Sequence, residues 1–524
     1  MPVDLRVHST IITNKVKGWT TIPNDANMDP AFAPIFQNIN LSRQGAIEKR
    51  FGHQPINAVA IDGDITSVME WCSDAADLCE ILVGTDAGKV YQLETTNEFT
   101  LLGSGFDTTG KFRAANFNGK LYMGNGVDTP QQYDGTTLSA WTPSAGTIPK
   151  FKYIHAHEGR IVVAGGPDLG VMVARHSSLE LPNDWAQLDP DDNPTTGFDN
   201  DLSFVLPKGD TLTSITTQDG YIVYQCKNHL VAYNLSTDIR TFSLVKVVRG
   251  QGCPAPDGNE LVGNEAYVWA RYGVKSLKET AATENVELGK DISEPIDNEL
   301  TDRLQAAIDN GLEDRITMIN YQKRSLLILN YPVNAGGTQY RQAVYNYRFK
   351  VWSEWTGQNF KDVFASSSGK LYGAGAGGIL FEMDTSGSDN STVIAFKWET
   401  PWLYLGDTAK IKDMDAADIV IANDDTVNMS MKWYFDIIES NETENTDTWT
   451  FGGPGPYWSE SGIDPIFQFD ELWTGSGKSS PLPFPMFGYG LTLKMIFENN
   501  EINTPFTFEY IRLDYNIGSR ASGR

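Results

Sequence analysis

The stretch 118–124, Asn-Gly-Lys-Leu-Tyr-Met-Gly, decides the fold, because a tight polar corner leads directly into a run of β-forming residues. Asn and Gly tolerate the positive φ that a two-residue hairpin turn requires. The motif Gly-Lys-Leu-Tyr returns unchanged at residues 369–372, which indicates internal duplication. Similar corners, each followed by β-forming residues, lie near residues 78, 158, 219, 264, 324 and 368.

The spacing of these corners is typical of a propeller. Between residues 78 and 368 they lie on average about 48 residues apart, which is the length of one four-stranded blade. The sequence therefore predicts an all-β fold in which residues 61–388 form a β-propeller of about seven blades, with six to eight as the range. We expect insertions rather than blade material at about 177–210 and 278–313. The second insertion carries apolar residues at a spacing of four, from Ile296 to Ile308, which predicts a helix.

The pattern changes after about Gly387. Longer stretches of alternating residues between Ile394 and Tyr515 predict a C-terminal β-sandwich-like domain over residues 389–524. Residues 1–60 are less regular, and we expect them to form an N-terminal arm or the strand that closes the propeller.

The composition describes a folded and strongly acidic chain. Of the 524 residues, 40% are hydrophobic and 11% are aromatic, which is too apolar for a disordered chain. The formal net charge is −26, from 41 Lys and Arg against 67 Asp and Glu. Such a surface repels phosphate, which argues against a protein that grips nucleic acid through a basic stripe.

Neither membrane insertion nor export is indicated by the sequence. It contains no run of about 18 apolar residues, and the N-terminus lacks the apolar core of a signal peptide. The four cysteines, Cys72, Cys79, Cys226 and Cys253, are too few for a disulfide framework. We expect all four to be free thiols in a protein made in a reducing cytoplasm.

One acidic stretch resembles a calcium loop. Asp189, Asp191 and Asn193 stand at alternate positions, from which oxygen atoms can converge on one hard cation. The sixth position of such a loop should be Gly for its sharp turn, and here it is Pro194. The pattern favours a solvated acidic loop, with a calcium site at these residues as the alternative.

The remaining motifs carry no catalytic signature. His155 and His157 face the same way on a strand, but no third His or Cys is near in sequence, which favours ordinary strand histidines. Residues 373–378, Gly-Ala-Gly-Ala-Gly-Gly, satisfy a dinucleotide fingerprint, yet the residues that follow alternate like a strand, so we expect a β-turn. We predict no catalytic residues, no bound cofactor and no enzyme activity.

Several separated segments resemble one protein family. The first is 38–52, which includes Gly-Ala-Ile-Glu-Lys-Arg-Phe-Gly at 45–52, with Phe51 where the family commonly has Pro. The others are 155–185, 344–355, 396–412 and 511–524. Together they resemble the propeller-bearing tail nozzle or tail hub proteins of short-tailed bacteriophages, the group that includes packaged-DNA-stabilisation proteins.

The resemblance implies a structural protein of the virion tail. Members of the family ring the tail axis below the portal and adaptor, hold the packaged genome, and let DNA pass during ejection. The implied partners are further copies of the chain in a ring, most simply a hexamer, together with adaptor or head-to-tail connector proteins, tail fibre or spike proteins, and genomic DNA in transit. The family has no catalytic residues to transfer.

Two basic segments are expected to be exposed and to contact neighbours in such a ring. Their residues are Arg43, Lys49, Arg50, Arg512, Arg520 and Arg524. Two alternatives from other classes stay open: a propeller hydrolase that acts on glycans, and a receptor-binding or adhesion module that uses the aromatic residues at 448–475.

Overall fold

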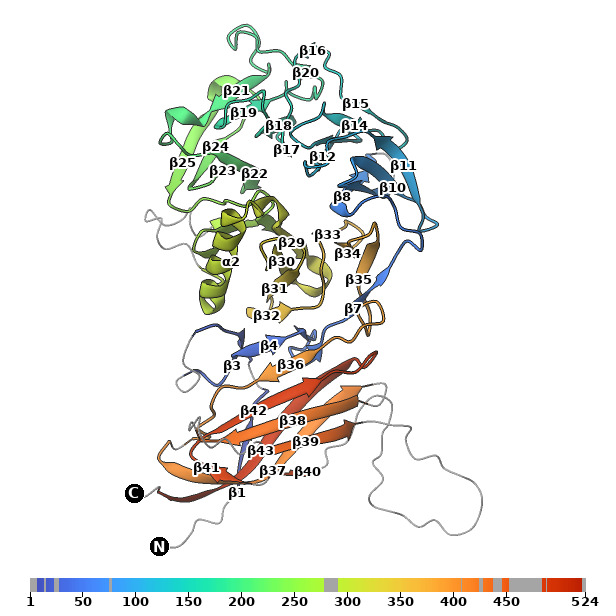
Figure 1. Cartoon of the computed structure of the whole chain (residues 1–524). Coiled ribbons are helices and arrows are strands. Elements are labelled where there is room, and N and C mark those ends of the chain that lie inside the picture. Colours follow the sequence, from blue (N-terminus) through green and yellow to red (C-terminus); the bar gives the residue numbers. More distant parts are fainter. Residues whose placement is uncertain are drawn as a thin grey trace. The chain divides into compact units, whose positions relative to one another are not determined.

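The computed structural model describes residues 7–13, 16–22, 28–74, 78–277, 291–406, 408–423, 427–436, 445–451, 483–486 and 488–520 (Figure 1). The chain divides into two compact units. The propeller unit comprises Pro55–Gln342 and Gln358–Met383, and the sandwich unit comprises Met1–Gln54, Ala343–Gly357 and Asp384–Arg524. Within the described residues, no helix has the length and apolar character needed to cross a membrane.

The propeller unit is built from seven blades that follow one another around a ring, and six of these blades are separate small antiparallel sheets (Figure 1). Each sheet is one blade, and most have four strands, as the corner spacing predicted. The strands of blades one to three are β8 (Ile65–Cys72), β9 (Cys79–Thr85), β10 (Lys89–Leu93), β11 (Phe99–Ser104); β12 (Arg113–Phe117), β13 (Lys120–Gly124), β14 (Gln131–Tyr133), β15 (Leu138–Ala140); β17 (Tyr153–His157), β18 (Arg160–Ala164), β19 (Val173–His176), β21 (Phe198–Asp201). Those of blades four to seven are β22 (Leu212–Gln218), β23 (Tyr221–Cys226), β24 (His229–Asn234), β25 (Ser243–Arg249); β26 (Asn259–Val262), β27 (Glu265–Ala270), β28 (Gly273–Ser276); β29 (Thr317–Tyr321), β30 (Leu326–Pro332), β31 (Tyr340–Asn346); β33 (Asp362–Ala365), β34 (Leu371–Ala374), β35 (Leu380–Ser386) and β7 (Gly52–Pro55). A short parallel pair, β16 (Ala145–Gly146) and β20 (Asp184–Trp185), lies outside these sheets.

The predicted corners form the tight hairpins between first and second strands. In blade two, Phe117 pairs with Lys120, and the two residues between them, Asn118 and Gly119, have φ of 48° and 69°. The corners at 158–159 and 219–220 also have positive φ at both residues. These are the backbone conformations that a right-twisted two-residue hairpin needs, so the prediction from the corner residues is confirmed at these three corners.

Apolar layers between neighbouring blades hold the ring together. One layer joins blade one to blade two through residues such as Leu82, Val90 and Met123. Comparable layers lie between blades two and three, three and four, and four and five. A blade cannot bury both of its faces alone, so its stability depends on its neighbours.

The chain before blade one closes the ring on blade seven. The backbone amide of Ile56 donates to the carbonyl of Leu380 at 2.8 Å, and that of Ile61 donates to Gly378 at 3.1 Å. The Asn57 side chain accepts from the Leu380 amide and donates to the Gly378 carbonyl. Blade seven therefore combines segments from both ends of the propeller sequence, which leaves no open edge between the last and first blades.

The two expected insertions differ. Residues 198–201 form β21, which pairs with β19 as the fourth strand of blade three, so the expectation that 177–210 is not blade material is wrong for this segment. In the second stretch, residues 278–290 lie outside the described residues. The predicted helix is confirmed as α2 (Asp297–Asp309), which buries Leu300 and Leu304. Short 3-10 turns are η2 (Leu202–Phe204), η3 (Ile239–Thr241), η5 (Glu294–Ile296), η6 (Glu313–Arg315) and η7 (Gln322–Arg324).

The sandwich unit contains two antiparallel-rich sheets. The first has the order β40 (Pro483–Pro485), β37 (Lys410–Asn423), β43 (Phe506–Arg520), β6 (Ile47–Lys49), β5 (Ile39–Leu41), with β1 (Val7–Ile11) on β43 and β41 (Tyr489–Gly490) on β37. In the second, the strands of this unit have the order β32 (Val351–Trp355), β4 (Ile35–Gln37), β36 (Phe396–Glu399), β42 (Leu493–Asn499), β38 (Val427–Phe435), β39 (Asn445–Phe451), with β2 (Gly18–Trp19) paired to β32 and β3 (Phe32–Ala33) paired to β2.

Aromatic side chains fill the space between these two sheets. The rings of Phe396 and Phe506 are 4.9 Å apart, and those of Phe497 and Phe508 are 5.7 Å apart. Each contact joins a strand of one sheet to β43 of the other, as alternating inward residues of a β-sandwich do.

The N-terminal segment differs from the expected arm. Its strands β1, β5 and β6 belong to the first sandwich sheet and β2 to β4 belong to the second. Its last strand, β7, pairs in blade seven, as the alternative of a closing strand predicted. The physical reason for the other strands lies in the alternation of β6, where Ile47 and Lys49 are buried and Glu48 is only partly covered. Irregular composition concealed these short strands, because none is longer than five residues.

Candidate functional site

The first strands of the blades surround a cavity of about 430 Å³ in the propeller unit. Its lining residues come from or adjoin β8, β12, β17, β22, β26, β29 and β33, so all seven blades contribute. In Figure 1 the labelled members of this set, β8, β12, β17, β22, β29 and β33, face the centre of the ring. A propeller concentrates side chains from distant parts of its sequence at this position, and a concave site with convergent polar groups is the default candidate for function.

An ion-pair network crosses this cavity. Asp257 of blade five accepts hydrogen bonds from Arg113 Nε at 2.7 Å, from Arg113 Nη2 at 2.9 Å and from Lys111 Nζ at 3.0 Å. Lys111 also contacts Asp362 of blade seven at 3.0 Å, and Arg113 contacts Asp314 at 3.1 Å. The network therefore ties blade two to blades five and seven by charge-assisted hydrogen bonds.

The charges in the network reinforce one another. Burial alone would raise the pKa of Asp257, but the attraction of Arg113 and Lys111 holds it well below its usual range. Burial would lower the pKa of Lys111, yet Asp257 and Asp362 raise it above its ordinary value. All three groups therefore stay charged at neutral pH, and both cations are engaged by carboxylates of this chain.

Glu260 behaves differently from the network carboxylates. It lines the same cavity, and burial raises its pKa to about 7, opposed only by a hydrogen bond from the Leu261 amide. His155 also lines the cavity, and burial together with repulsion from His157 lowers its pKa to about 4. The same cavity is thus lined by a carboxyl that titrates near neutrality and by a neutral imidazole, two groups suited to proton transfer.

Glu260 is expected to make stability fall as pH rises from about 4.5 to 7. Its folded-state pKa is raised above the unfolded value of 4.5, so the folded chain binds more protons in this window and loses that advantage above it. Between pH 4.5 and 7, the free energy of unfolding of the wild-type protein should fall by about 1–3 kcal/mol more than that of Glu260→Gln. Urea unfolding at several pH values would measure this difference. Parallel pH profiles of the two proteins would contradict the assignment.

The calcium candidate is a hydrogen-bonded loop. Asp189 Oδ1 accepts from the Asp191 amide at 3.0 Å, and Asn193 Oδ1 accepts from the Thr195 hydroxyl at 3.0 Å. The Asn193 amide donates to the Asp189 carbonyl at 2.8 Å. These contacts account for local turns in this loop.

The expected exposure of Lys49 and Arg50 is wrong. Each is only 2% exposed, because β6 and the residue after it turn these side chains into the sandwich unit. Lys49 Nζ donates to Asn499 Oδ1 at 2.7 Å, and burial lowers its pKa to about 8. Arg43 of the same basic segment is exposed, as expected.

The C-terminal basic residues are only partly described. Arg512 is paired within the chain with Asp418 and with Asp514. The backbone of Arg520 in β43 pairs with that of Lys410 in β37, and Arg524 lies outside the described residues. The aromatic stretch 452–475 is likewise outside them.

The expectation of four free thiols is wrong for one pair. Cys72 and Cys79 form a disulfide, whereas Cys226 and Cys253 are free and buried. The two bridged residues stand directly opposite each other on β8 and β9. A cross-strand pair of this kind brings Cβ atoms about 5 Å apart, a proximity that a spacing of six intervening residues did not reveal.

Comparisons with known proteins find similar solved structures but no relative by sequence. No protein-family model and no curated protein matches the sequence. Among solved structures, the chain is similar to the Pan2 WD40 domain of Neurospora crassa, at 10% identity and a TM-score of 0.38, over 64% of this chain and 94% of that one. It is also similar to virginiamycin B lyase from Staphylococcus aureus, at 10% identity and 0.36, over 72% and 98%. A third is BamB from Moraxella catarrhalis, at 12% identity and 0.36, over 66% and 96%.

Sequence reasoning missed the residues of the ion-pair network. Lys111, Asp257 and Asp362 come from three blades and are separated by more than a hundred residues in sequence. One signal could have found them: Asp362 begins the first strand of its blade, whereas Lys111 and Asp257 lie two residues before theirs. Charged residues beside the innermost strand of several blades indicate a shared position near the propeller axis.

Proposed function

We propose that this chain is a structural subunit of a short-tailed bacteriophage tail, of the nozzle or hub type. In this role it assembles with copies of itself into a ring, most simply a hexamer, and binds adaptor and fibre or spike proteins. The ring retains packaged DNA and lets it pass during ejection. The proposed location is the virion tail, and the proposed role involves no catalysis.

One observation carries this proposal: two segments that resemble the tail family, 38–52 and 344–355, meet at the buried guanidinium of Arg50, which lies over the ring of Trp355 at 5.9 Å. Its Nη1 and Nη2 contact Asp389 at 2.8 and 2.5 Å, its Nε donates to Asn38 Oδ1 at 2.7 Å, and its Nη2 also donates to the Thr356 carbonyl at 2.8 Å. Trp355 from the third of these segments donates to the Ile39 carbonyl at 3.3 Å. The Arg50 side chain of the Lys-Arg motif therefore holds separate segments of the sandwich unit together, as expected in a structural protein.

A second resembling segment has a comparable task in the propeller unit. Arg160 is fully buried and donates to the carbonyls of Ser177, Thr196 and Thr237 at 2.7, 2.8 and 3.2 Å. Its guanidinium connects β18 to loops that follow β19 and β24. Burial lowers its pKa to about 10, so it remains charged at neutral pH.

The acidity of the chain is compatible with DNA in transit. With a net charge of −26, a channel wall built from such subunits repels phosphate and leaves a duplex free to slide. In the cavity of the propeller unit, Lys111 and Arg113 are neutralised by carboxylates and do not offer a phosphate site.

The proposal predicts a ring. The purified full-length chain should form a closed particle visible by negative-stain microscopy, and six copies of the 58.0 kDa chain would give roughly 350 kDa by light scattering. An antibody against the chain should label the tails of virions. Arg43→Glu should shift the particle toward monomers, whereas Lys208→Glu, at another exposed site, should not. A chain that stays monomeric, with an antibody that labels no tail, would overturn the proposal.

The glycan hydrolase remains a second candidate because of Glu260. A carboxyl with a pKa of about 7 in a cavity has the character of the general acid that protonates a leaving glycoside oxygen. As a hydrolase, the wild-type chain would release dye from labelled polysaccharides and Glu260→Gln would lose that activity. The absence of release by the wild-type chain would exclude this candidate for the polysaccharides used.

A further inference from the structure

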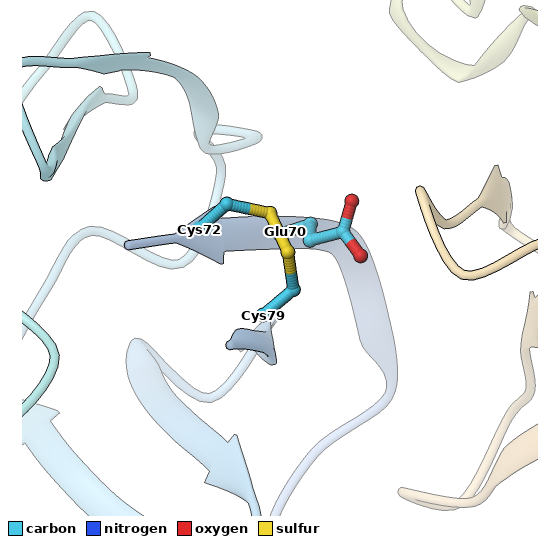
Figure 2. Close-up of side chains that lie close together, drawn as sticks. All are labelled: Glu70, Cys72 and Cys79. Atoms are coloured by element: carbon cyan, nitrogen blue, oxygen red, sulfur yellow. A yellow bond between two sulfur atoms is a disulfide. The ribbon is translucent and has the colours of Figure 1, made fainter. Parts of the chain in front are cut away.

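Three potential metal ligands lie on one face of the first hairpin of the propeller unit. Glu70 and Cys72 are two residues apart on β8, so their side chains point to the same side of the strand. Cys79 of β9 stands directly opposite Cys72 and projects from the same face. The ligand atoms of the three residues all lie within 4.8 Å of one another. Figure 2 shows the three side chains together.

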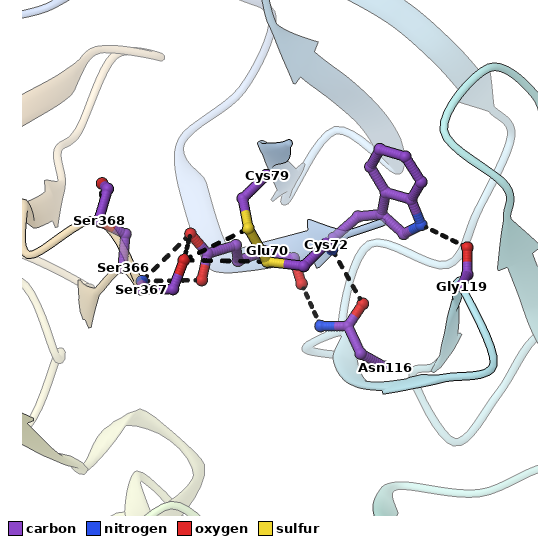
Figure 3. Close-up of a disulfide and its surroundings, with 9 residues drawn as sticks. Glu70, Cys72, Cys79, Asn116, Gly119, Ser366, Ser367 and Ser368 are labelled. Atoms are coloured by element: carbon purple, nitrogen blue, oxygen red, sulfur yellow. Dashed lines mark hydrogen bonds between the residues drawn. A yellow bond between two sulfur atoms is a disulfide. The ribbon is translucent and has the colours of Figure 1, made fainter. Parts of the chain in front are cut away.

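A fourth polar group covers this face. The hydroxyl of Ser367, in the turn between β33 and β34 of blade seven, lies 3.0 Å from Glu70 Oε1, 3.3 Å from Cys79 Sγ and 3.8 Å from Cys72 Sγ (Figure 3). The Ser367 amide donates to both carboxylate oxygens of Glu70, at 3.2 and 2.9 Å. These hydrogen bonds hold the carboxylate beside the sulfur atoms, as outer contacts orient the ligands of metal sites.

We propose that Glu70, Cys72 and Cys79 form a redox-gated site for a thiophilic divalent cation such as Zn²⁺. The disulfide is the closed form, in which no thiolate is available. In the reduced form the two sulfur atoms and one Glu70 oxygen bind the ion, and the Ser367 hydroxyl or a water molecule completes a tetrahedral set. Thiolate and carboxylate are established ligands of Zn²⁺.

The opening step needs a dithiol reductant. Its thiolate attacks one sulfur atom, the bond between Cys72 and Cys79 breaks, and a mixed disulfide forms. The second reductant thiol then resolves this mixed disulfide, so the protein gains two electrons and two protons while the reductant becomes a disulfide. Binding of the cation displaces both thiol protons to solvent. Cys79 is exposed, so a reductant can reach the bridge.

The other two cysteines are poor competitors for the ion. Cys226 and Cys253 are both 0% exposed, and burial raises the pKa of each thiol above its usual range. The thiolate, not the thiol, is the ligand of a metal ion. Accessible thiolates among the cysteines of this chain therefore come from the reduced pair.

The site lies where the first blade meets its two neighbours. Asn116 of blade two donates to the Glu70 carbonyl at 2.7 Å, and Trp71 Nε1 donates to the Gly119 carbonyl at 2.9 Å (Figure 3). Ser367 belongs to blade seven, which the chain before blade one closes. An ion bound here would join the first blade to the last at the closure of the ring.

Cobalt binding by the full-length chain tests the proposal. After reduction with a dithiol and its removal without oxygen, Co²⁺ should produce a thiolate-to-cobalt charge-transfer band that Zn²⁺ abolishes. The oxidised wild-type chain and Cys72→Ser/Cys79→Ser should show no band. Glu70→Gln should weaken Co²⁺ binding about 10-fold to 100-fold, which is the loss of metal affinity typical when a residue that supports a metal site is changed.

A carboxylate on the opposite face is the matched control. Glu80 pairs with Trp71 on the same hairpin and therefore projects from the other side, so Glu80→Gln should bind Co²⁺ as the wild-type chain does. The proposal is overturned if the reduced chain shows no charge-transfer band, if the band persists in the oxidised chain, or if Glu70→Gln binds as tightly as Glu80→Gln.

Discussion

Replacing Asp389 by Ala is expected to lower the free energy of unfolding of the sandwich unit by about 3–5 kcal/mol, because the fully buried guanidinium of Arg50 would lose its carboxylate. Asp389 contacts both terminal nitrogens of Arg50 and also Nδ1 of His53 at 3.0 Å. Urea unfolding combined with hydrogen exchange of β5 and β6 would measure the loss in this unit.

The ion pair between Arg50 and Asp389 is also expected to stay charged in moderate acid. Burial alone would raise the pKa of Asp389, but hydrogen bonds from Arg50 and His53 lower it to about 2. A depressed folded pKa stabilises the protein above the unfolded value near 4, and this contribution is lost as pH falls toward 2. The stability difference between wild type and Asp389→Ala should therefore shrink between pH 4 and 2.

Lys397→Ala supplies a control in the same unit. Lys397 and Glu498 form a cross-strand pair at 3.2 Å, with side chains 32% and 26% exposed. Removing such a solvated pair should cost no more than about 1 kcal/mol. If Asp389→Ala proves no more damaging than Lys397→Ala, the buried pair does not anchor the unit.

Asp257→Ala should be the most damaging single change in the central cavity of the propeller unit, with an expected loss of about 2–4 kcal/mol. The substitution removes the bidentate partner of Arg113 and one partner of Lys111, whose side chains are 11% and 14% exposed. Each cation keeps one other carboxylate, so the expected loss is smaller than at Asp389. Thermal and urea unfolding would measure it.

Asp314→Ala tests whether the effect comes from burial. Asp314 contacts the same Arg113 at 3.1 Å, but its side chain is 42% exposed, so its loss should cost about 1 kcal/mol or less. Equal effects of the two substitutions would mean that the network contributes only screened surface attraction.

The corners and the helix α2 were predictable because their causes are local. Asn118 and Gly119 tolerate positive φ wherever they stand, and the strands that flank them pair across a two-residue loop. Leu300 and Leu304 lie one helical turn apart, so a buried stripe can be recognised before the partner surface is known.

The charged residues were misjudged because burial is decided by distant segments. The sequence 45–52 resembles a solvated basic segment, but Lys49 is enclosed by residues near 500 and Arg50 by residues near 356 and 389. The ion-pair network of the cavity was missed for the same reason, because Asp257 and Arg113 are 144 residues apart in the sequence. Sequence spacing carries no information about such pairs.

The sequence by itself determined a propeller of repeated hairpins followed by a sandwich, because turn chemistry and alternation act within a few residues. Only the tertiary structure decided which charges are neutralised, that Cys72 faces Cys79, and that Glu70 and Ser367 lie beside them. Ring closure and strand register bring these side chains within a few ångströms, and both are properties of the whole chain rather than of any short segment of it.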